Sequence, residues 1–261
     1  MPRRSLRRRR ACRPAANNRP NLNLVLFSPE EASRPLPRAD RRADHILEVL
    51  RRKPGDTFDV GLINGPLGKA TLVRATPDAL HLTFAWNNAT PSPPSALTLL
   101  VGLPRPQTAR DILRDATTLG ATAMWFVATE RSERSYASSK LWTTGEWRQH
   151  VLAGAEQAFS TFVPEVKSGD ALEAALVSLP AGQTRIALDN YEAAHRLMDI
   201  APSRETPVVL AIGPERGWTP RDRDALRAHQ FHLANLGSRI LRTETAVVAA
   251  LTLIRAKAGG G

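Results

Sequence analysis

The segment Val208–Thr219 reads VVLAIGPERGWT and is followed by Pro220. Its first five residues are apolar and predict a buried strand, and the two glycines of Gly213–Gly217 predict a tight loop directly after it. Thr219 and Pro220 are the residue types that open a helix as N-cap and first helical residue. A continuously apolar strand leading through a loop into a helix is typical of a parallel sheet covered on both faces.

A second segment, Asn235–Ala246 (NLGSRILRTETA), repeats this arrangement. A predicted strand at 232–236 ends beside Gly237, and a helix is predicted over 244–257. Charged residues among apolar ones at a helix N-terminus are candidates for a ligand site, which singles out Arg239, Arg242 and Glu244. The alternative is structural: Thr243 caps the helix, Glu244 complements its dipole, and Arg242 pairs with Glu244.

The chain around these two segments alternates strand and helix patterns, which predicts an α/β domain with a parallel sheet. Further strands are predicted at 96–103, 123–128 and 185–188, and helices at 108–119, 146–159, 192–198 and 220–228. The preceding part differs. It has strand patterns at 21–27, 57–60, 69–74 and 79–86 and one helix at 39–52, which predict a β-barrel of about 70 residues.

The segment Asn87–Pro94 (NNATPSPP) is rich in proline and predicts a linker. The expected organisation is therefore a tail over 1–20, a barrel over 21–88, a linker over 89–95 and an α/β domain over 96–261. The tail carries eight arginines and no acid, and such a composition predicts disorder. The tail is then a solvated extension or a start codon assigned too far upstream; a non-specific nucleic-acid arm is the alternative.

The net charge of +11 is concentrated in that tail, so the rest of the chain carries only +3. Cys12 is the single cysteine, which excludes an internal disulfide and a cysteine-based zinc site. The six histidines show no metal-ligand spacing, so no metal is expected. No apolar run approaches the roughly 18 residues of a membrane span. A cytoplasmic protein without membrane contact is predicted.

The two loop segments together resemble the RsmE family of SPOUT methyltransferases, and His45–Arg51 with Gly55-Asp56, Thr129–Ser132, Glu156-Gln157 and Val163-Pro164 match it too. The resemblance covers about residues 22–257. It implies an α/β fold made of an N-terminal PUA-like barrel and a C-terminal SPOUT domain with a trefoil knot. It also implies methylation of N3 of a uridine in small-subunit (16S) ribosomal RNA, with S-adenosyl-L-methionine as the cofactor and a homodimer as the assembly.

By motif matching, the resemblance assigns the cofactor site to three loops. The first two contribute Ile212, Gly213, Pro214, Glu215 and Gly217, and Leu236, Gly237, Ile240, Leu241 and Arg242; the third contributes Asp189. The imide N3 of uracil is protonated at neutral pH, so the reaction needs a base or a stabilised anion. Arg242 is the candidate for stabilising the negative O2/O4 edge, and Glu244, or alternatively Glu215, is the candidate base.

Phosphate contacts are expected from a basic cluster near the barrel and from residues beside the α/β strand ends: Arg41, Arg42, Arg51, Arg52, Lys53, Arg105, Arg131 and Arg134. The expected partner is small-subunit ribosomal RNA or the assembled small subunit. The chain departs from the family pattern at Arg216, where glycine is usual, and at Ser160, where arginine is usual. Two alternatives therefore stay open: a methyltransferase for another RNA nucleoside, and a non-enzymatic RNA-binding ribosome-assembly protein.

Overall fold

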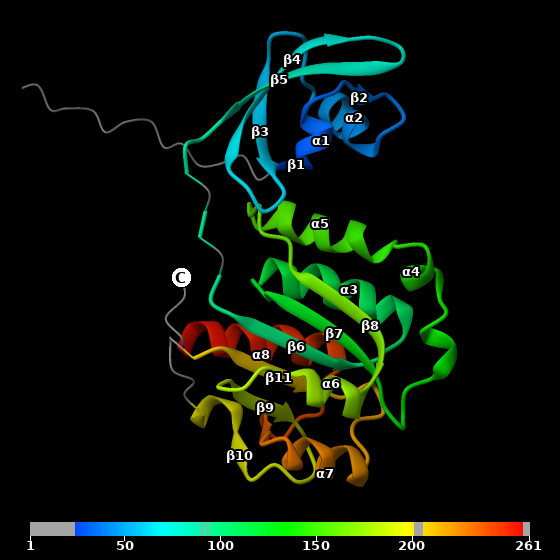
Figure 1. The fold of residues 1–261 in the computed structure, drawn as a ribbon, viewed down its shortest axis with the longest axis vertical. Coiled ribbons are helices and arrows are strands. Elements are labelled where there is room, and N and C mark those ends of the chain that lie inside the picture. The colour runs from blue at the N-terminus through cyan, green and yellow to red at the C-terminus, as the bar shows by residue number, and fades with distance from the viewer. Residues whose placement is uncertain (1–23, 90, 93, 201–205, 258–261) are drawn as a thin grey trace, which may run out of the picture.

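The computed structural model describes residues 24–89, 91–92, 94–200 and 206–257. Two sheets, one on each side of helix α5 (Trp147–Gln157), form the molecule (Figure 1). The predicted tail and the first residues of the predicted strand 21–27 lie outside the described residues. No helix in the described part of the chain is long and apolar enough to cross a membrane.

The N-terminal sheet has five strands in the order β1-β3-β4-β5-β2. β1 pairs in parallel with β3, and the other neighbours are antiparallel. Phe27, Phe58, Val60 and Leu72 are among its buried residues. The strands are β1 (Val25–Phe27), β2 (Leu36–Pro37), β3 (Thr57–Leu62), β4 (Leu67–Ala75) and β5 (Ala79–Trp86).

The predicted helix at 39–52 is present but shorter, and it changes its hydrogen-bonding pattern. Its first turn is α2 (Arg41–Asp44), with the Asp40 side chain accepting from the Arg42 amide. It then widens into the π-helix η1 (His45–Val49), where the Leu50 amide donates to the His45 carbonyl. The pattern of apolar residues could not predict this widening, because the pattern shows which side of a helix is buried and not which carbonyl each amide donates to. A short helix α1 (Pro29–Ala32) precedes β2.

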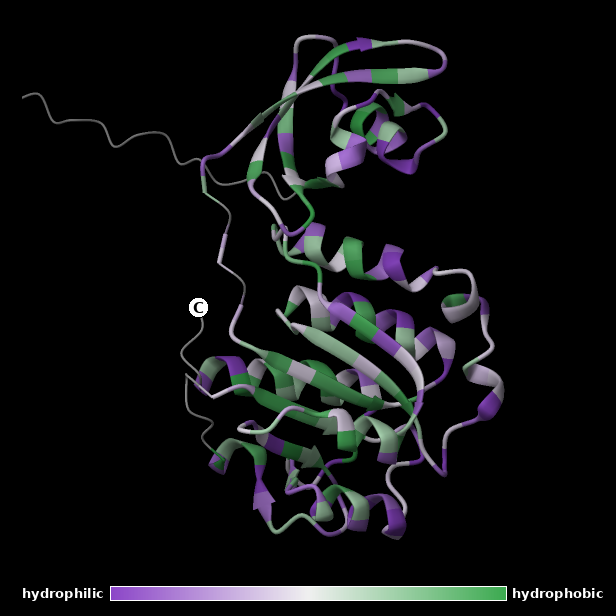
Figure 2. Cartoon of the chain, in the orientation of Figure 1, coloured by the Kyte–Doolittle hydropathy of each residue, from purple (hydrophilic) through white to green (hydrophobic). Residues whose placement is uncertain are grey.

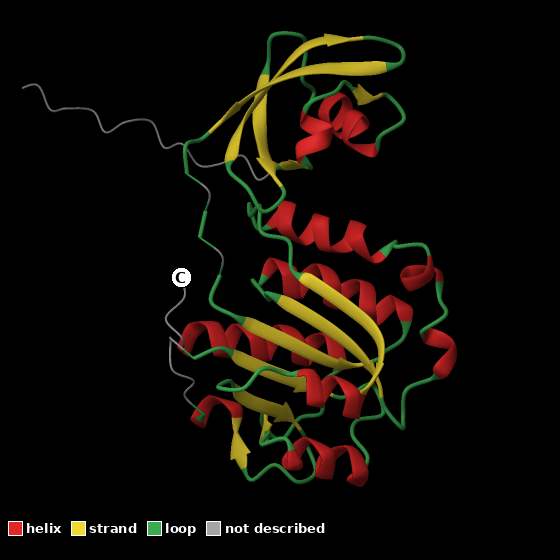
Figure 3. Ribbon diagram, in the orientation of Figure 1, coloured by secondary structure: helices red, strands yellow, loops and turns green. Residues whose placement is uncertain are grey.

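The larger sheet has seven parallel strands in the order β10-β12-β9-β11-β6-β7-β8, so the prediction of a parallel sheet is confirmed. The strands are β6 (Leu97–Gly102), β7 (Ala123–Ala128), β8 (Glu165–Ala171), β9 (Thr184–Leu188), β10 (His195–Arg196), β11 (Val208–Ile212) and β12 (His232–Asn235). Helices lie on both faces of the sheet (Figure 3): α3 (Pro106–Thr118), α4 (Lys140–Thr143), α5, α6 (Leu172–Ser178), α7 (Pro220–Ala228) and α8 (Thr243–Lys257).

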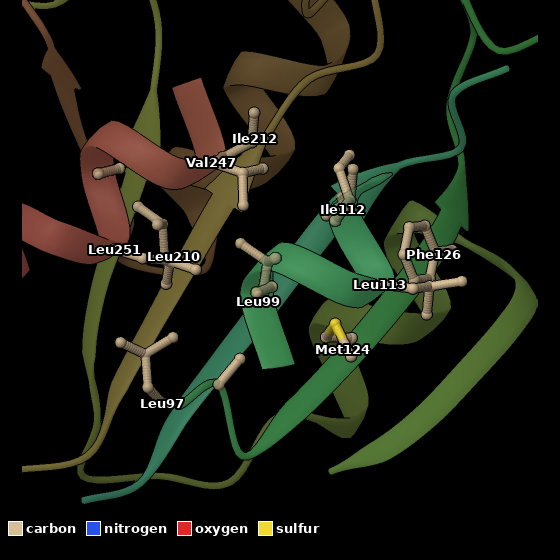
Figure 4. Packing of buried hydrophobic residues seen from close by; sticks show 14 of the residues in the cluster. Leu97, Leu99, Ile112, Leu113, Met124, Phe126, Leu210, Ile212, Val247 and Leu251 are labelled. Carbon is tan, nitrogen blue, oxygen red and sulfur yellow. The ribbon is translucent and has the colours of Figure 1, made fainter. Parts of the chain in front are cut away.

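The central strands bury side chains on both faces. On β11, Leu210 and Ile212 pack with α3 and α8, as Figure 4 shows, whereas Val209 and Ala211 pack with α6 and α7. Figure 2 shows the same pattern as predominantly hydrophobic colour along the middle of the sheet and polar colour on the outer helices. This double burial explains why these strands are apolar at every position.

Two parts of the prediction need correction. A helix was expected at 192–198, but the segment forms β10 followed by the 3-10 helix η3 (Leu197–Asp199). β10 pairs with β12, and this pairing outweighs the local helical spacing of a short polar segment. The strand β8 and helix α6 were not predicted, because β8 lies at the sheet edge and is mostly exposed, which leaves it without an apolar pattern.

The N-terminal sheet is fastened to the larger part of the molecule by apolar packing and by hydrogen bonds. Leu24 and Leu26 pack against Ala155 of α5. The Asn64 amide donates to the Thr161 carbonyl (2.7 Å), and the Thr161 hydroxyl donates to the Gly65 carbonyl (2.7 Å). These contacts hold the N-terminal sheet in a fixed position relative to the larger sheet.

Candidate functional site

The candidate site lies where the carboxyl ends of β12, β9, β11 and β6 meet, because these neighbouring strands all run in the same direction. The loops after them, with the first turn of α8, enclose a cavity of about 710 Å³. Ligands bind in this position in open α/β sheets, and the volume falls within the range of small-molecule sites. The cavity is lined by Ile212, Gly213, Pro214, Glu215, Gly217, Leu236, Ile240, Leu241, Arg242, Glu244, Asp189 and Arg105, all of them expected site residues.

The loop after β11 follows its predicted form. Gly217 has a φ of +66°, a conformation that favours glycine. Thr219 caps α7 by accepting from the Asp222 amide, and the Asp222 carboxylate accepts from the Thr219 amide in return. Pro214 lies so close to Gly102 at the end of β6 that a Cβ on Gly102 would be 2.3 Å from the Pro214 Cδ. The loop after β11 therefore packs directly against the end of β6, with no room for a side chain between Gly102 and Pro214.

The same loop is held by two contacts that the sequence could not show. The Glu215 carboxylate accepts from the Arg105 amide at the start of α3 (2.9 Å). The Arg131 guanidinium donates to the Arg216 carbonyl (2.6 Å). Glu215 is thus a structural anchor at a helix N-terminus, which weakens the alternative that it acts as the base. Arg131 was expected to contact RNA, and here it supports the wall of the cavity.

The loop after β9 is organised by Asp189. Burial alone would raise the pKa of this carboxyl group, but Arg223 and the amides of Glu192 and Tyr191 hold the pKa below its ordinary value. The Arg223 Nε lies 2.8 Å from the Asp189 Oδ2, and the two side chains are 6% and 2% exposed. Asp189 therefore stays ionised and paired with Arg223. Its carboxylate fixes the backbone of the loop after β9, which forms part of the cavity wall.

The loop after β12 and the start of α8 form the opposite wall. Arg242 is exposed and Glu244 is half-buried, and Thr243 between them is buried. Among the described residues no ion pair joins Arg242 to Glu244, so both side chains remain available to a ligand. Gly237 lines a second, adjoining cavity of about 500 Å³ instead of the first.

Arg239, singled out in the sequence beside Arg242 and Glu244, also lines the cavity. Several other lining residues were not predicted as site residues: Thr108, Leu188, Asn190, Tyr191, Arg216, Trp218, Thr243 and Ala246. Trp218 is almost fully buried, and its indole N–H donates to the Leu188 carbonyl (2.9 Å), which ties the loop after β11 to the end of β9. Since β9 and β11 are neighbours only in the folded sheet, the order of strands was needed to find this contact.

The expected RNA-contact residues near the N-terminal sheet fall into two groups. Arg51, Arg52 and Lys53 make no ion pair within the described residues, and Arg41 lies 3.8 Å from Glu156 across the junction with α5. Arg42 differs, because Glu31 and Asp40 each lie 2.7 Å from its guanidinium. Its pKa is raised despite burial, because those carboxylates bond to it. Arg42 therefore belongs to the internal contacts of the fold and is left out of the RNA surface.

No group of three or more possible metal ligands occurs in the parts of the chain that the structure describes. The cavity is instead built from backbone, apolar side chains and a few charged groups, which suits an organic ligand.

A parallel sheet with such a cavity at its carboxyl edge defines a ligand-binding α/β protein, and comparison with known proteins specifies the class. The model of the RNA methyltransferase domain family matches residues 91–255, and the chain belongs to this family.

Two similar relatives show to which group within the RNA methyltransferase family the chain belongs. A protein from Treponema pallidum named ribosomal RNA small subunit methyltransferase E is 34% identical over 91% of this chain and 92% of its own length. A protein of the same name from Borreliella burgdorferi, with a suffix 1, is 26% identical over 90% and 98%. The predicted resemblance to the RsmE family is thereby confirmed.

Solved structures show the same fold. A ribosomal RNA small subunit methyltransferase E from Neisseria gonorrhoeae, bound to S-adenosyl methionine, matches with a TM-score of 0.71 and 27% identity, over 82% of this chain and 89% of that one. A probable rRNA-methyltransferase from Porphyromonas gingivalis matches with a TM-score of 0.74, at 20% identity, over 90% and 98%.

Proposed function

We propose that this chain transfers a methyl group from S-adenosyl-L-methionine to N3 of a uridine in small-subunit ribosomal RNA. The observation that carries the proposal is the single cavity formed by the two motif loops and the loop after β9. These are the segments that the family resemblance assigned to the cofactor. The names of the relatives support the ribosomal substrate, and the bound ligand of the N. gonorrhoeae structure supports the cofactor.

The cavity fits such a cofactor in size and in chemistry. Leu188, Ile212 and Leu241 offer an apolar surface for an aromatic ring, and the half-buried backbone at Gly217 lines the cavity beside them. Glu215 and Glu244 place carboxylates near a ligand that carries positive charge. When bound, S-adenosyl-L-methionine supplies a methyl group on a positively charged sulfur.

The residues of this chain then have to bind the uracil and remove its N3 proton. Arg242 stands at the cavity with no carboxylate partner in the described structure, which suits it to stabilise negative charge on the O2/O4 edge. Glu244 lies one helical residue beyond Thr243 on the same wall and is the proposed base. The rest of the rate comes from alignment of the two reacting atoms by the rigid loops.

The remaining expectations belong to the same proposal. The N-terminal sheet acts as the PUA-like RNA-binding barrel, and the cavity loops are threaded as a SPOUT trefoil knot. The tail, barrel, linker and methyltransferase domain cover 1–20, 21–88, 89–95 and 96–261. The protein works as a cytoplasmic homodimer on ribosomal RNA or the assembled small subunit. Arg41, Arg51, Arg52, Lys53 and Arg105 contact phosphates.

Substitution of Arg242 by alanine tests the catalytic assignment. We expect methylation to fall by about 100- to 1000-fold, as for the loss of one group that stabilises developing charge. Thermal unfolding should be unchanged, because Arg242 is exposed and makes no ion pair within the described chain. Near-normal methylation by this variant would contradict the role.

Two measurements separate the proposal from its alternatives. Calorimetric titration with S-adenosyl-L-methionine should show binding, whereas a ribosome-assembly protein without enzymatic activity would show none. Mass spectrometry of ribosomal RNA from a deletion strain should show loss of one N3-methyluridine. Loss of a different methylated nucleoside would keep the enzyme and correct its substrate.

A further inference from the structure

A second cavity of about 500 Å³ adjoins the first, on the other side of the loop after β12. Asn190, Tyr191 and Ile240 line both cavities and therefore lie at the boundary between the two. Gly237, Ser238 and Arg196 complete much of the second one. The reaction proposed above needs only the first cavity for the cofactor and the reacting base.

Tyr191, between the two cavities, is fixed in position although it is 73% exposed. Its amide donates to the Asp189 carboxylate (2.8 Å), which fixes the backbone. One face of its ring lies over the Arg223 guanidinium, whose central carbon is 5.2 Å from the ring centre. Arg223 is itself held by Asp189, so the ring is oriented by a buried ion pair. The exposed area of the ring is consequently an aromatic surface that is already oriented before anything binds.

The surroundings of this ring are apolar and positively charged. Ile240 beside it is 79% exposed. Arg196 in the second cavity and Arg239 in the first are exposed and have no carboxylate partner in the described structure. The nearby carboxylates of Asp189 and Glu192 are neutralised by Arg223 and Arg227. A planar aromatic molecule attached to negative charge fits this surface.

We propose that the second cavity holds a nucleobase next to the target uridine, stacked on Tyr191, while its phosphate is contacted by Arg196. This inference rests on the proposed function. Aromatic stacking accepts any base, because every base has a π face. The cavity thus keeps the RNA strand open on one side of the target without selecting a sequence, and the single-stranded form exposes the target to the cofactor.

Substitution of Tyr191 by alanine should weaken binding of unmethylated small-subunit ribosomal RNA about 5- to 150-fold, the loss of one base–aromatic stack. Substitution by phenylalanine should preserve the affinity, because the ring remains. Because Tyr191 also lines the first cavity, the dissociation constant for S-adenosyl-L-methionine is measured in parallel, and the loss of RNA affinity in Tyr191→Ala should exceed any loss of cofactor affinity. Val177→Ala is the matched control: it removes an exposed apolar side chain (76% exposed) from α6, and RNA affinity should not change.

A second readout reports stacking directly. In the variant Tyr191→Trp, tryptophan fluorescence should be quenched on addition of the RNA to a greater extent than in the wild-type protein. Unchanged RNA affinity in Tyr191→Ala, or equal quenching in both proteins, would overturn the proposal. Conversion of a dimer to a monomer by Tyr191→Ala, measured by light scattering, would assign the surface to a second copy of the chain and also overturn it.

Failure of this inference can be distinguished from failure of the proposed function. If the wild-type protein binds the RNA and Tyr191→Ala binds equally well, only the second cavity is misassigned. If the wild-type protein neither binds nor methylates ribosomal RNA, the proposed function itself is wrong, and the stacking surface falls with it.

Discussion

Gly102 ends β6 in contact with Pro214, and no side chain fits between them. The substitution Gly102→Ala should push the loop after β11 out of position and weaken binding of S-adenosyl-L-methionine at least about 10-fold, with a stability loss of about 1–3 kcal/mol from overpacking. Calorimetric titration and thermal unfolding measure the two effects.

The control for Gly102 is Gly68 in β4, where a Cβ would be 2.4 Å from the Ala85 carbonyl oxygen. Gly68→Ala should cost similar stability, but it should leave cofactor affinity unchanged because it lies in the N-terminal sheet. Equal cofactor affinity in both variants would show that the contact between Gly102 and Pro214 does not position the loop.

Arg131 gives a second prediction at this scale. It donates to the Arg216 carbonyl, so Arg131→Ala should raise the dissociation constant for the cofactor several-fold. Arg134, three residues further along, is exposed and makes no ion pair within the described chain, and Arg134→Ala should leave that constant unchanged. If Arg131→Ala weakens RNA binding alone, the expectation of a phosphate contact is correct and the supporting role is not.

Individual site residues were predictable where a local motif marked them and not elsewhere. The loops after β11 and β12 each form one continuous motif, and the resemblance of these motifs to the family assigned Gly213, Glu215 and Arg242 to the site. Gly102, Tyr191 and Trp218 act through partners on other strands. Their roles depend on which strands are neighbours, and no local pattern records that.

At the scale of elements, α7 is joined to the loop after β9 by the buried pair of Arg223 and Asp189. Arg223→Ala would leave the Asp189 carboxylate buried without its partner, and we expect a loss of about 3–5 kcal/mol of stability. Arg221 on the same helix is 74% exposed and lies 3.5 Å from Glu130 and from Glu173. Arg221→Ala should cost no more than about 1 kcal/mol. Chemical denaturation compares the two, and equal losses would contradict the structural role of the buried pair.

Helices and strands were predictable where one face, or the whole element, is buried, because burial leaves a regular pattern of apolar residues in the sequence. The bounds of β5, β7, β11 and α7 agree with the prediction residue for residue, because apolar runs or cap residues mark both ends. The edge strands β8 and β10 are exposed, and their pairing with neighbours decides their conformation. The π-helix η1 escaped prediction because its burial pattern resembles that of an ordinary helix.

At the scale of the whole molecule, Glu156 lies at the junction of the two sheets. Burial raises the pKa of this carboxyl group, although the Leu26 amide and the charges of Arg41 and Arg42 act in the opposite direction. The folded protein therefore holds a proton to higher pH than the unfolded chain. Stability from this group falls as pH rises from about the ordinary pKa of 4.5 through the raised value, and the cost persists at neutral pH.

Glu156→Gln should abolish that fall, so the variant should gain stability relative to wild type as pH rises above about 4.5. Glu31 provides a contrast, because the hydrogen bond from Arg42 lowers the pKa of its carboxyl group despite burial. Glu31→Gln should lose stability relative to wild type at neutral pH, and the difference should fade as pH falls through the lowered pKa. Unfolding followed from pH 3 to pH 8 tests both signs, and the same sign for the two variants would contradict this assignment.

The junction that contains Glu156 has one more consequence. The N-terminal sheet is joined to α5 by packing of Leu26 on Ala155 and by the bonds between Asn64 and Thr161, all of which are independent of the peptide connection near residues 87–96. Two separately expressed fragments, divided within that connection, should consequently reassemble in the test tube into a functional heterodimer. The contact between the N-terminal sheet and α5 therefore resembles an interface between two protein partners that are encoded as a single chain.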